Sequence, residues 1–252
     1  MTFYELYKAM EMKIQLDLRC EWDNDGIMCV DNLEKKVKRV LIALDVTADT
    51  VNHAIENSYD TIISHHPLVF RAQKAITPMS YTQDKLISLI QGKVGVMSFH
   101  TRLDAVKGGV NDALSSVLGL TDVTVDLADP IGRIGHTKET MELSQFAREV
   151  KDALGSPFVL YSGQEQVSKV YVVGGDGKDL IDNAVASGCD TIVTGRASYN
   201  TSIDASDMGI NIIEAGHFYT ENPVCKILKS MIKSIDATIV ADIYCSNRIK
   251  AI

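Results

Sequence analysis

The chain has 252 residues, of which 46% are hydrophobic and 23% are charged, and its formal net charge is −8. A chain of this length and composition builds one large domain or two small domains with a real core, and it leaves little room for long disordered segments. The acidic charge, without any run of Lys or Arg, argues against general nucleic-acid binding, and no apolar stretch reaches the roughly 18 residues of a membrane span.

The first expected element is a helix over residues 4–16, which carries charges in its first turns. This segment has no apolar core of the kind found in signal peptides, so it does not predict export. The cysteines are odd in number and form no C-x-x-C pair; they are Cys20, Cys29, Cys189, Cys225 and Cys245. These features predict reduced thiols and a cytoplasmic location.

An internal repeat organises the chain. The apolar runs 40–44 and 170–174 correspond, as do the runs 60–64 and 190–194, and Asp60 recurs as Asp190 at an offset of 130 residues. Each pair of runs is typical of buried strands, and each is joined by a helix-like segment, residues 49–57 in the first copy and 179–187 in the second. Strand, helix and strand in this order predict two βαβ units with right-handed crossovers.

The repeat continues into a second pair of strands, residues 94–97 and 211–213, and each is followed by a His-x-x-x-acid pattern. The two patterns are His100 to Asp104 and His217 to Glu221, now at an offset of 117 residues. Helices are expected before each copy, at 4–16 and 140–154, and after the first pattern at 110–118. The sequence therefore predicts an α/β fold with mixed, mostly parallel sheets, duplicated as repeats of about 1–127 and 128–252 that join near the loop 129–132 and pack as one unit.

Two adjacent histidines, His65 and His66, follow the predicted strand that ends at Ser64. In a parallel sheet, ligands collect beyond the carboxyl ends of strands. Taken alone, such a pair is better explained as a solvated turn, and one His-x-x-x-acid pattern is better explained as a surface ion pair. Residues four apart on a helical turn share a face, however, and three such features at strand ends of a duplicated fold favour a metal site.

The candidate ligands are imidazoles and carboxylates, which suit Zn, Mn or Fe, and there is no thiolate cluster to indicate a structural zinc site. Two ions about 3.5–4 Å apart would need a bridging carboxylate and an open position for water. We therefore expect two divalent metal ions per subunit and hydrolytic chemistry on a small molecule.

Two further residues are candidates for supporting roles. His100 is interpreted as an acid–base group or a partner of the ligands, and its alternative is a hydrogen-bonded histidine at a strand end. Arg196 is a candidate phosphate contact, since a guanidinium fork fits phosphate oxygens, and an exposed, solvated arginine is an equal alternative. The segment Gly174–Gly177 lies between a strand and a helix and is better explained by turn geometry than by phosphate binding.

Several motifs along nearly the whole chain resemble the NGG-interacting factor three-like family, also called GTP cyclohydrolase I type 2 homologues. The motifs are Trp22–Asn24, Leu44–Thr47, Ser64–Phe70, His100–Ala105, Gly108–Asp112 and Ala215–Glu221. The resemblance implies intertwined α/β modules assembled into ring-shaped homohexamers. It also implies that His66 and Asp104 hold one ion, that His65 and His217 hold the other, and that Glu221 bridges them.

The sequence departs from many relatives in the segment 194–200, where they have Thr-Gly-Glu and often histidines. Here Arg196 follows Gly195, and Tyr199 and Asn200 follow further on, so the polar wall of the substrate pocket differs. We expect a metal-dependent hydrolase that acts on a nucleotide, a phosphoester or a cyclic amide, with GTP cyclohydrolase-like activity included. The alternative is a non-enzymatic protein for metal storage, metal insertion or regulatory binding, because ligands specify a metal site and do not specify a reaction.

Overall fold

The computed structural model describes residues 1–163 and 166–251, and the chain divides into two compact units. Unit 1 consists of Met1–Leu103 and Cys225–Arg248, and unit 2 consists of Asp104–Val224 and the residues from Ile249 onward. The units and the predicted repeats divide the chain differently, because the segment 225–248 lies in the second repeat but belongs to unit 1.

Unit 1 is built on a five-stranded sheet with the strand order β1-β4-β3-β2-β11. Its strands are β1 (Gly26–Cys29), β2 (Arg39–Ala43), β3 (Thr61–Ser64), β4 (Gly95–Ser98) and β11 (Val240–Ile243). Its helices are α1 (Phe3–Lys13), α2 (Ala48–Glu56), α3 (Tyr81–Gln91) and α10 (Val224–Ile235), and a 3₁₀ turn spans Leu16–Leu18. All neighbouring strands run parallel except β1, which pairs antiparallel with β4 at one edge.

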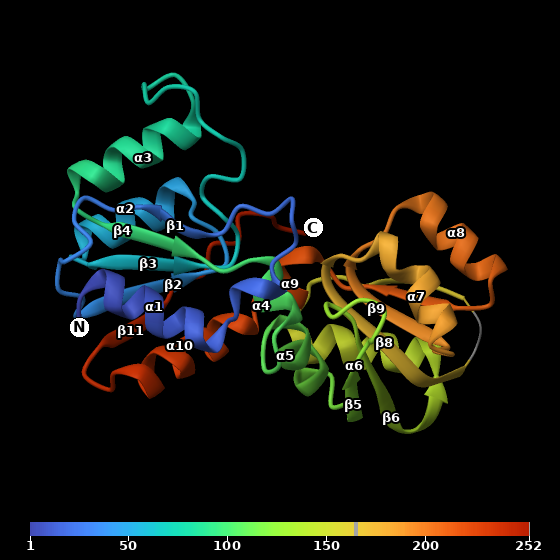
Figure 1. Cartoon of the computed structure of the whole chain (residues 1–252). Coiled ribbons are helices and arrows are strands. Elements are labelled where there is room, and N and C mark those ends of the chain that lie inside the picture. Colours follow the sequence, from blue (N-terminus) through green and yellow to red (C-terminus); the bar gives the residue numbers. More distant parts are fainter. Residues whose placement is uncertain (164–165, 252) are drawn as a thin grey trace. The chain divides into compact units, whose positions relative to one another are not determined.

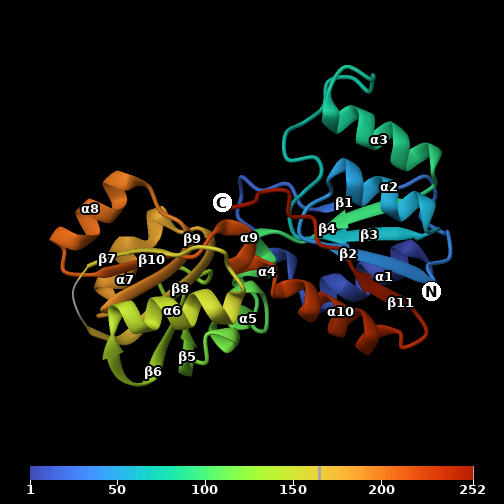
Figure 2. The same ribbon diagram turned by 180° about the vertical axis from the view of Figure 1, so that it is seen from behind.

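Both faces of this sheet are covered, α2 and α3 lying on one face and α1 and α10 on the other (Figures 1 and 2). On the first face, Leu41 and Ile62 of the sheet pack with Val51 of α2 and Leu89 of α3. On the second face α1 lies so close to β4 that a side chain at Gly95 would come within 2.4 Å of the Phe3 ring. Strands buried on both faces must be apolar throughout, which is why the sequence shows unbroken apolar runs here.

Unit 2 is built on a six-stranded sheet with the strand order β5-β6-β8-β9-β10-β7. Its strands are β5 (Thr121–Val125), β6 (Arg133–Glu142), β7 (Leu160–Ser162), β8 (Gln166–Asp176), β9 (Thr191–Arg196) and β10 (Asn211–Glu214). Its helices are α5 (Val110–Val117), α6 (Leu143–Leu154), α7 (Ile181–Ala186), α8 (Tyr199–Asp207) and α9 (His217–Glu221), with a 3₁₀ turn at Lys178–Leu180. The short helix α4 (Thr101–Ala105) contains the boundary between the two units.

The core of unit 2 has two halves because successive strand residues point to opposite faces of the sheet. Val170 and Val172 of β8 pack with Phe146 of α6, whereas Tyr171 and Val173 pack on the other face with Ile181 at the start of α7. The two mixed sheets therefore have the same layered construction, and the predicted α/β class is confirmed.

The strand registers reproduce the sequence repeat. Val40 of β2 lies opposite Thr61 of β3, and Val170 of β8 lies opposite Thr191 of β9, so both members of the pair are shifted by 130 residues. Thr61 also lies opposite Gly95 and Thr191 opposite Asn211, a shift of 116 between β4 and β10. Since the following histidines are 117 residues apart, the second copy has one more residue between strand and histidine. Gly216 is in this linker and has a φ of +88°, a conformation that favours glycine.

The structure differs from the sequence-based expectation at the edges of the second sheet. The helix predicted at 140–154 starts only at Leu143, because β6 continues to Glu142 and pairs antiparallel with β8. β5 and β7 are also antiparallel to their neighbours, so parallel pairing in this sheet is limited to β8, β9 and β10. Among the described residues, no helix is long and apolar enough to cross a membrane.

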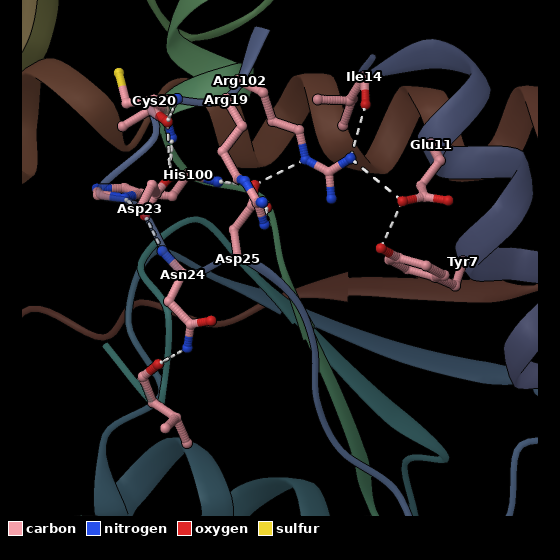
Figure 3. Close-up of polar contacts among 12 residues, drawn as sticks. Tyr7, Glu11, Ile14, Arg19, Cys20, Asp23, Asn24, Asp25, His100 and Arg102 are labelled. Carbon is pink, nitrogen blue, oxygen red and sulfur yellow. Dashed lines mark hydrogen bonds and ion pairs between the residues drawn. The ribbon is translucent and has the colours of Figure 1, made fainter. Parts of the chain in front are cut away.

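A buried ion pair in unit 1 fixes the chain just after β4 (Figure 3). Arg102 is completely buried, and its Nε donates to Asp25 Oδ2 at 2.8 Å, while its Nη1 donates to the Ile14 carbonyl at 3.1 Å. The guanidinium also lies 4.9 Å from the centre of the Phe99 ring. The same Asp25 oxygen accepts the backbone N–H of His100 at 3.2 Å, so one carboxylate holds both ends of the segment 100–102.

Replacement of Arg102 by methionine should lower the free energy of unfolding by about 3–5 kcal/mol, because it leaves the buried Asp25 carboxylate without its main partner. Urea unfolding of the two proteins measures this difference. The control is Arg148→Ala on the exposed side of α6, which should change the value by less than about 0.5 kcal/mol. Equal values for both variants would show that the ion pair does not hold the fold.

Candidate metal site

His65 follows β3 and is completely buried. Its Nδ1 lies 2.9 Å from the carbonyl oxygen of Phe99. A carbonyl oxygen only accepts hydrogen bonds, so Nδ1 carries the ring proton and Nε2 of the neutral imidazole carries the lone pair. This tautomer is the one that presents Nε2 as a metal ligand.

His66 is held in the same way by a side chain. Its Nδ1 lies 2.7 Å from Asp45 Oδ1, in the loop that follows β2. The backbone N–H of Asp45 in turn donates to Ser246 Oγ at 3.1 Å. A histidine whose Nδ1 proton is donated to a carboxylate is the arrangement that orients metal-binding imidazoles and increases their basicity.

His100 repeats this arrangement a third time (Figure 3). Its Nδ1 lies 2.8 Å from Asp23 Oδ1, and the other Asp23 oxygen accepts from the N–H and the hydroxyl of Thr101 at 3.1 and 2.7 Å. Burial raises the pKa of the Asp23 carboxyl, but the hydrogen bonds from His100 and Thr101 outweigh this effect and bring the pKa down to about 2. Asp23 is therefore ionised at neutral pH and accepts a hydrogen bond from His100 Nδ1.

The three histidines of unit 1 lie together. One ring nitrogen from each of His65, His66 and His100 lies within 4.8 Å of the other two, and the ring centres of His65 and His100 are 5.2 Å apart. From the sequence, His100 is predicted to be an acid–base group or a partner of the ligands, outside the ligand set. The geometry also permits it to be a ligand, since its tautomer matches that of its two neighbours.

Unit 2 brings together the remaining three candidates. His217 and Glu221 lie four residues apart in α9, and His217 Nε2 is 2.9 Å from Glu221 Oε2. A carboxylate oxygen of Asp104 lies within 4.8 Å of one of Glu221. Glu221 is only 5% exposed, whereas His217 is exposed. Of the two conformations that the sequence left open for the His-x-x-x-acid pattern, helical turn or loop, α9 has the helical turn, and after β4 the Leu103 N–H donates to the His100 carbonyl at 2.7 Å.

Glycines make room for the Glu221 side chain. A Cβ atom at Gly175, which has a φ of +70°, would lie 2.2 Å from Glu221 Oε1, and one at Gly174 would lie 3.1 Å from Glu221 Cγ. A Cβ atom at Gly195 would lie 2.7 Å from the His217 Cα. Gly174 and Gly175 belong to β8 and not to a turn, and they are required for the close approach of α9.

Arg196 ends β9, and its side chain is exposed. Its backbone pairs with that of Asp176 on β8. Within residues 1–163 and 166–251, the structure gives its guanidinium no ion pair, so a contact with a substrate phosphate stays a prediction.

Sequence reasoning missed the residues that orient the ligands. Asp23 and Asp45 belong to conspicuous motifs, yet nothing in the sequence assigned them to His100 and His66. The available signal was position, because Asp45 follows β2 as His66 follows β3, and these strands are parallel neighbours. The partner of His65 is a backbone carbonyl, which no side-chain pattern can indicate.

Known proteins match the chain along its whole length. Residues 1–250 match the family described as Duf34/NIF3 (NGG1p interacting factor 3). The chain is 33% identical over 248 residues to the "GTP cyclohydrolase 1 type 2 homolog" of Clostridium perfringens, which covers 95% of this chain and 94% of that protein. A protein with the same description from Clostridium acetobutylicum is 32% identical over 238 residues, covering 91% and 88%.

Solved structures share the architecture. The Staphylococcus aureus hypothetical protein SA1388 superposes with a TM-score of 0.89 at 25% identity, covering 100% of this chain and 99% of its own. Reduced HcgD from Methanocaldococcus jannaschii gives a TM-score of 0.84 at 26% identity, covering 96% and 97%. A Bacillus cereus protein related to NIF3, at 24% identity and a TM-score of 0.90 with 100% and 99% coverage, supports the fold alone.

Replacement of Asp23 by asparagine should remove a pH-dependent part of the stability. The folded-state pKa of about 2 is below the ordinary value of 3.8, so the ionised carboxylate stabilises the fold above pH 3.8, and this stabilisation is lost as the pH falls through 2. Between pH 5 and pH 2, the unfolding free energy of the wild type should fall by about 2 kcal/mol more than that of the variant. Chemical denaturation of both metal-free proteins across this range tests it, and parallel curves would contradict it.

Replacement of Gly175 by alanine should displace Glu221, whereas Gly209→Ala is the matched control. Both positions have positive φ, +70° and +77°, but a Cβ atom at Gly209 would have no neighbour within 4 Å. Both variants should lose about 1–2 kcal/mol for the backbone conformation, and Gly175→Ala should lose a further 1–3 kcal/mol through the contact with Glu221. Denaturation measures the stability, and metal titration should show weaker binding for Gly175→Ala alone. Equal metal affinity in the two variants would show that Gly175 does not contribute to metal binding.

Proposed function

The chain belongs to the Duf34/NIF3 (NGG1p interacting factor 3) family, as its motifs predicted, and from this premise we propose that it is a two-metal-dependent hydrolase. The proposed ligands are His65, His66, Asp104, His217 and Glu221, with His66 and Asp104 on one ion, His65 and His217 on the other, and Glu221 bridging. The proposed substrate is a small nucleotide, phosphoester or cyclic amide.

The observation that carries the proposal is the shared state of three histidines. His65, His66 and His100 each direct the Nδ1 proton to a fixed oxygen, and one ring nitrogen of each lies within 4.8 Å of the others. Three imidazoles at such spacing, each with Nδ1 directed at an oxygen, fit a divalent transition metal. Histidines with a purely structural role form hydrogen bonds through their ring nitrogens, and nothing requires three of them to lie this close together.

The carboxylates of unit 2 complete the donor chemistry that Zn, Mn or Fe requires. Glu221 is nearly buried and has His217 at 2.9 Å on the same helical turn. A buried carboxylate is expensive to desolvate unless cations or hydrogen bonds offset the burial, so a metal ion explains its position. His100 and Asp104 are four residues apart along the chain, which is the sequence reason for combining the two sets of ligands in one centre.

The residues around the ligands have separable roles in this proposal. Asp45 and Asp23 hold the protons at Nδ1 of His66 and His100, and Arg102 fixes the segment that carries His100 by binding Asp25. Gly175 leaves the space that the Glu221 carboxylate needs. Divalent ions held there would acidify water and polarise a phosphoryl or carbonyl oxygen, which is the chemistry that hydrolysis needs.

The substrate assignment has the support of the relatives' description, "GTP cyclohydrolase 1 type 2 homolog", and of the donor set. We propose that Arg196, exposed at the end of β9, contacts a phosphate of the substrate. The family resemblance further supports a cytoplasmic homohexamer. The rival function is metal storage, metal insertion or regulatory binding without turnover, for which the same ligands would serve.

Replacement of Glu221 by glutamine tests the proposal, since it preserves the size of the side chain and removes its charge. Purified protein is analysed for Zn, Mn and Fe and is assayed with each metal against nucleotides, phosphoesters and cyclic amides. We expect metal-dependent turnover that chelation abolishes and that the variant lowers about a hundredfold or more while remaining folded. The control is Glu56→Gln at the exposed end of α2, which should retain full activity.

Two results would decide against the hydrolase. Unchanged turnover in folded, metal-free Glu221→Gln protein would exclude a role of the metal centre in the reaction. Reversible binding of metal at the five ligands, without turnover of any compound in the panel, would instead establish the non-enzymatic function.

A further inference from the structure

A pocket of about 500 Å³ lies within unit 1 beside His66. Its walls come from the loops that follow β2 and β3 and from the first turns of α3, so it opens beyond the carboxyl ends of two parallel strands, where α/β sheets bind ligands. Its volume is in the range of small-molecule sites. The residues used below are Asp45, His66, Phe70, Arg71, Tyr81 and Lys85.

Lys85 places a positive charge in the wall of the pocket. Its Nζ donates to the Val46 carbonyl at 2.7 Å and lies 5.6 Å from the centre of the Tyr81 ring. Burial lowers the pKa of this ammonium, an effect that the nearby Asp45 charge opposes. An ammonium has three donors and the Val46 carbonyl accepts one of them, so Lys85 can still donate to an anion in the pocket.

Arg71 adds a second cation. Its side chain is exposed, and its guanidinium forms no ion pair with any residue in the described part of the chain. Its charge is therefore available to a ligand. The Thr47 hydroxyl caps the start of α2, and the first turn of α3 contributes Tyr81 and Thr82, so two helix N-termini also border the pocket. Their dipoles increase the preference for an anion that the two cations create.

Two aromatic rings at the pocket are largely exposed. Tyr81 is 81% exposed and Phe70 is 47% exposed, although burial in the core is the ordinary position for such rings. Phe70 lies edge-on to His100, with ring centres 6.3 Å apart, so it stands beside the histidine cluster. Exposed rings next to cations provide stacking surfaces for a flat ligand.

The pocket adjoins the candidate metal ligands through one residue. His66 lines it together with Asp45, the carboxylate that accepts the His66 proton. That carboxylate is negatively charged and would repel an anion, whereas Lys85 and Arg71 would attract one. The charges therefore orient a ligand, with its anionic group on the cations.

We infer that this pocket binds the substrate as a planar ring that bears a phosphate group, with the phosphate on Lys85 and Arg71 and the ring against Tyr81 and Phe70. This inference rests on the proposed function, because it treats the bound molecule as the substrate of the metal site. It assigns that substrate to a nucleotide-like class. The pocket gives the substrate a binding place and names the residues that contact it, and the metal ligands alone give neither.

The test is isothermal titration of the full chain, stripped of metal by chelation, with AMP, adenosine and inorganic phosphate. AMP should bind, and adenosine and phosphate should each bind at least tenfold more weakly. Lys85→Met and Arg71→Met should each weaken AMP binding about tenfold, because each removes a charged hydrogen bond to the phosphate. Tyr81→Leu should weaken it about fivefold or more, whereas Tyr81→Phe should retain it, because stacking needs the ring and not the hydroxyl.

Matched controls keep the result interpretable. Lys151→Met on the exposed face of α6 removes a lysine outside the pocket and should leave AMP binding unchanged. Arg71 is exposed, so its variant should fold even if Lys85→Met does not. Zinc titration of each variant should give the wild-type affinity, because neither cation is a proposed ligand.

Failure of this inference is distinct from failure of the proposed function. Absence of AMP binding, or AMP binding that neither Lys85→Met nor Arg71→Met weakens, would overturn the pocket assignment and leave the metal-dependent reaction untouched. Phosphate binding as tight as AMP binding would overturn the part of the inference that concerns the ring. AMP binding that depends on both cations, in a protein without metal-dependent turnover, would support the pocket and reject the hydrolase.

Discussion

The direction of three protons governs the candidate site. Because the Phe99 carbonyl, Asp45 and Asp23 each accept a hydrogen bond from an Nδ1, the rings of His65, His66 and His100 share one tautomer and each ring is held in place. The rest of unit 1 preserves this state, since the buried pair of Arg102 and Asp25 fixes the segment that carries His100. A fold that lost these acceptors would still contain the histidines, but it would no longer present their lone pairs together.

Duplication accounts for the framework, and departures from it account for the chemistry. The pairs β2–β3 and β8–β9 share the same register, shifted by 130 residues, yet only the first copy has two histidines after its second strand. The second copy has Gly195 and Arg196 there, and Gly195 leaves the room that His217 occupies. The second copy has one more residue between its strand and the histidine of the His-x-x-x-acid pattern, and Gly216 lies in this linker.

The sequence predicted the features that follow from local pattern. Unbroken apolar runs predicted β2, β3, β8 and β9, and the spacing of His217 and Glu221 was compatible with the helical turn of α9. It did not predict the antiparallel strands β5, β6 and β7, which depend on pairing across the sheet, and it did not assign Asp23 to His100, 77 residues away. The space that Gly175 leaves for Glu221 is also a tertiary property, because the glycine alone indicates only a turn.

The return of the chain to unit 1 sets an order of events during synthesis. Unit 2 is continuous up to Val224, whereas unit 1 needs β11, whose Val240 pairs with Arg39 of β2 about 200 residues earlier. Ser246, which binds the backbone of Asp45, leaves the ribosome later still. Since contacts so distant in sequence form slowly, we expect the support of His66 to be completed after the local contacts that position Asp104 and Glu221. One continuous segment of unit 2 thus supplies the oxygen donors, whereas the support of His66 depends on a residue 201 positions after Asp45.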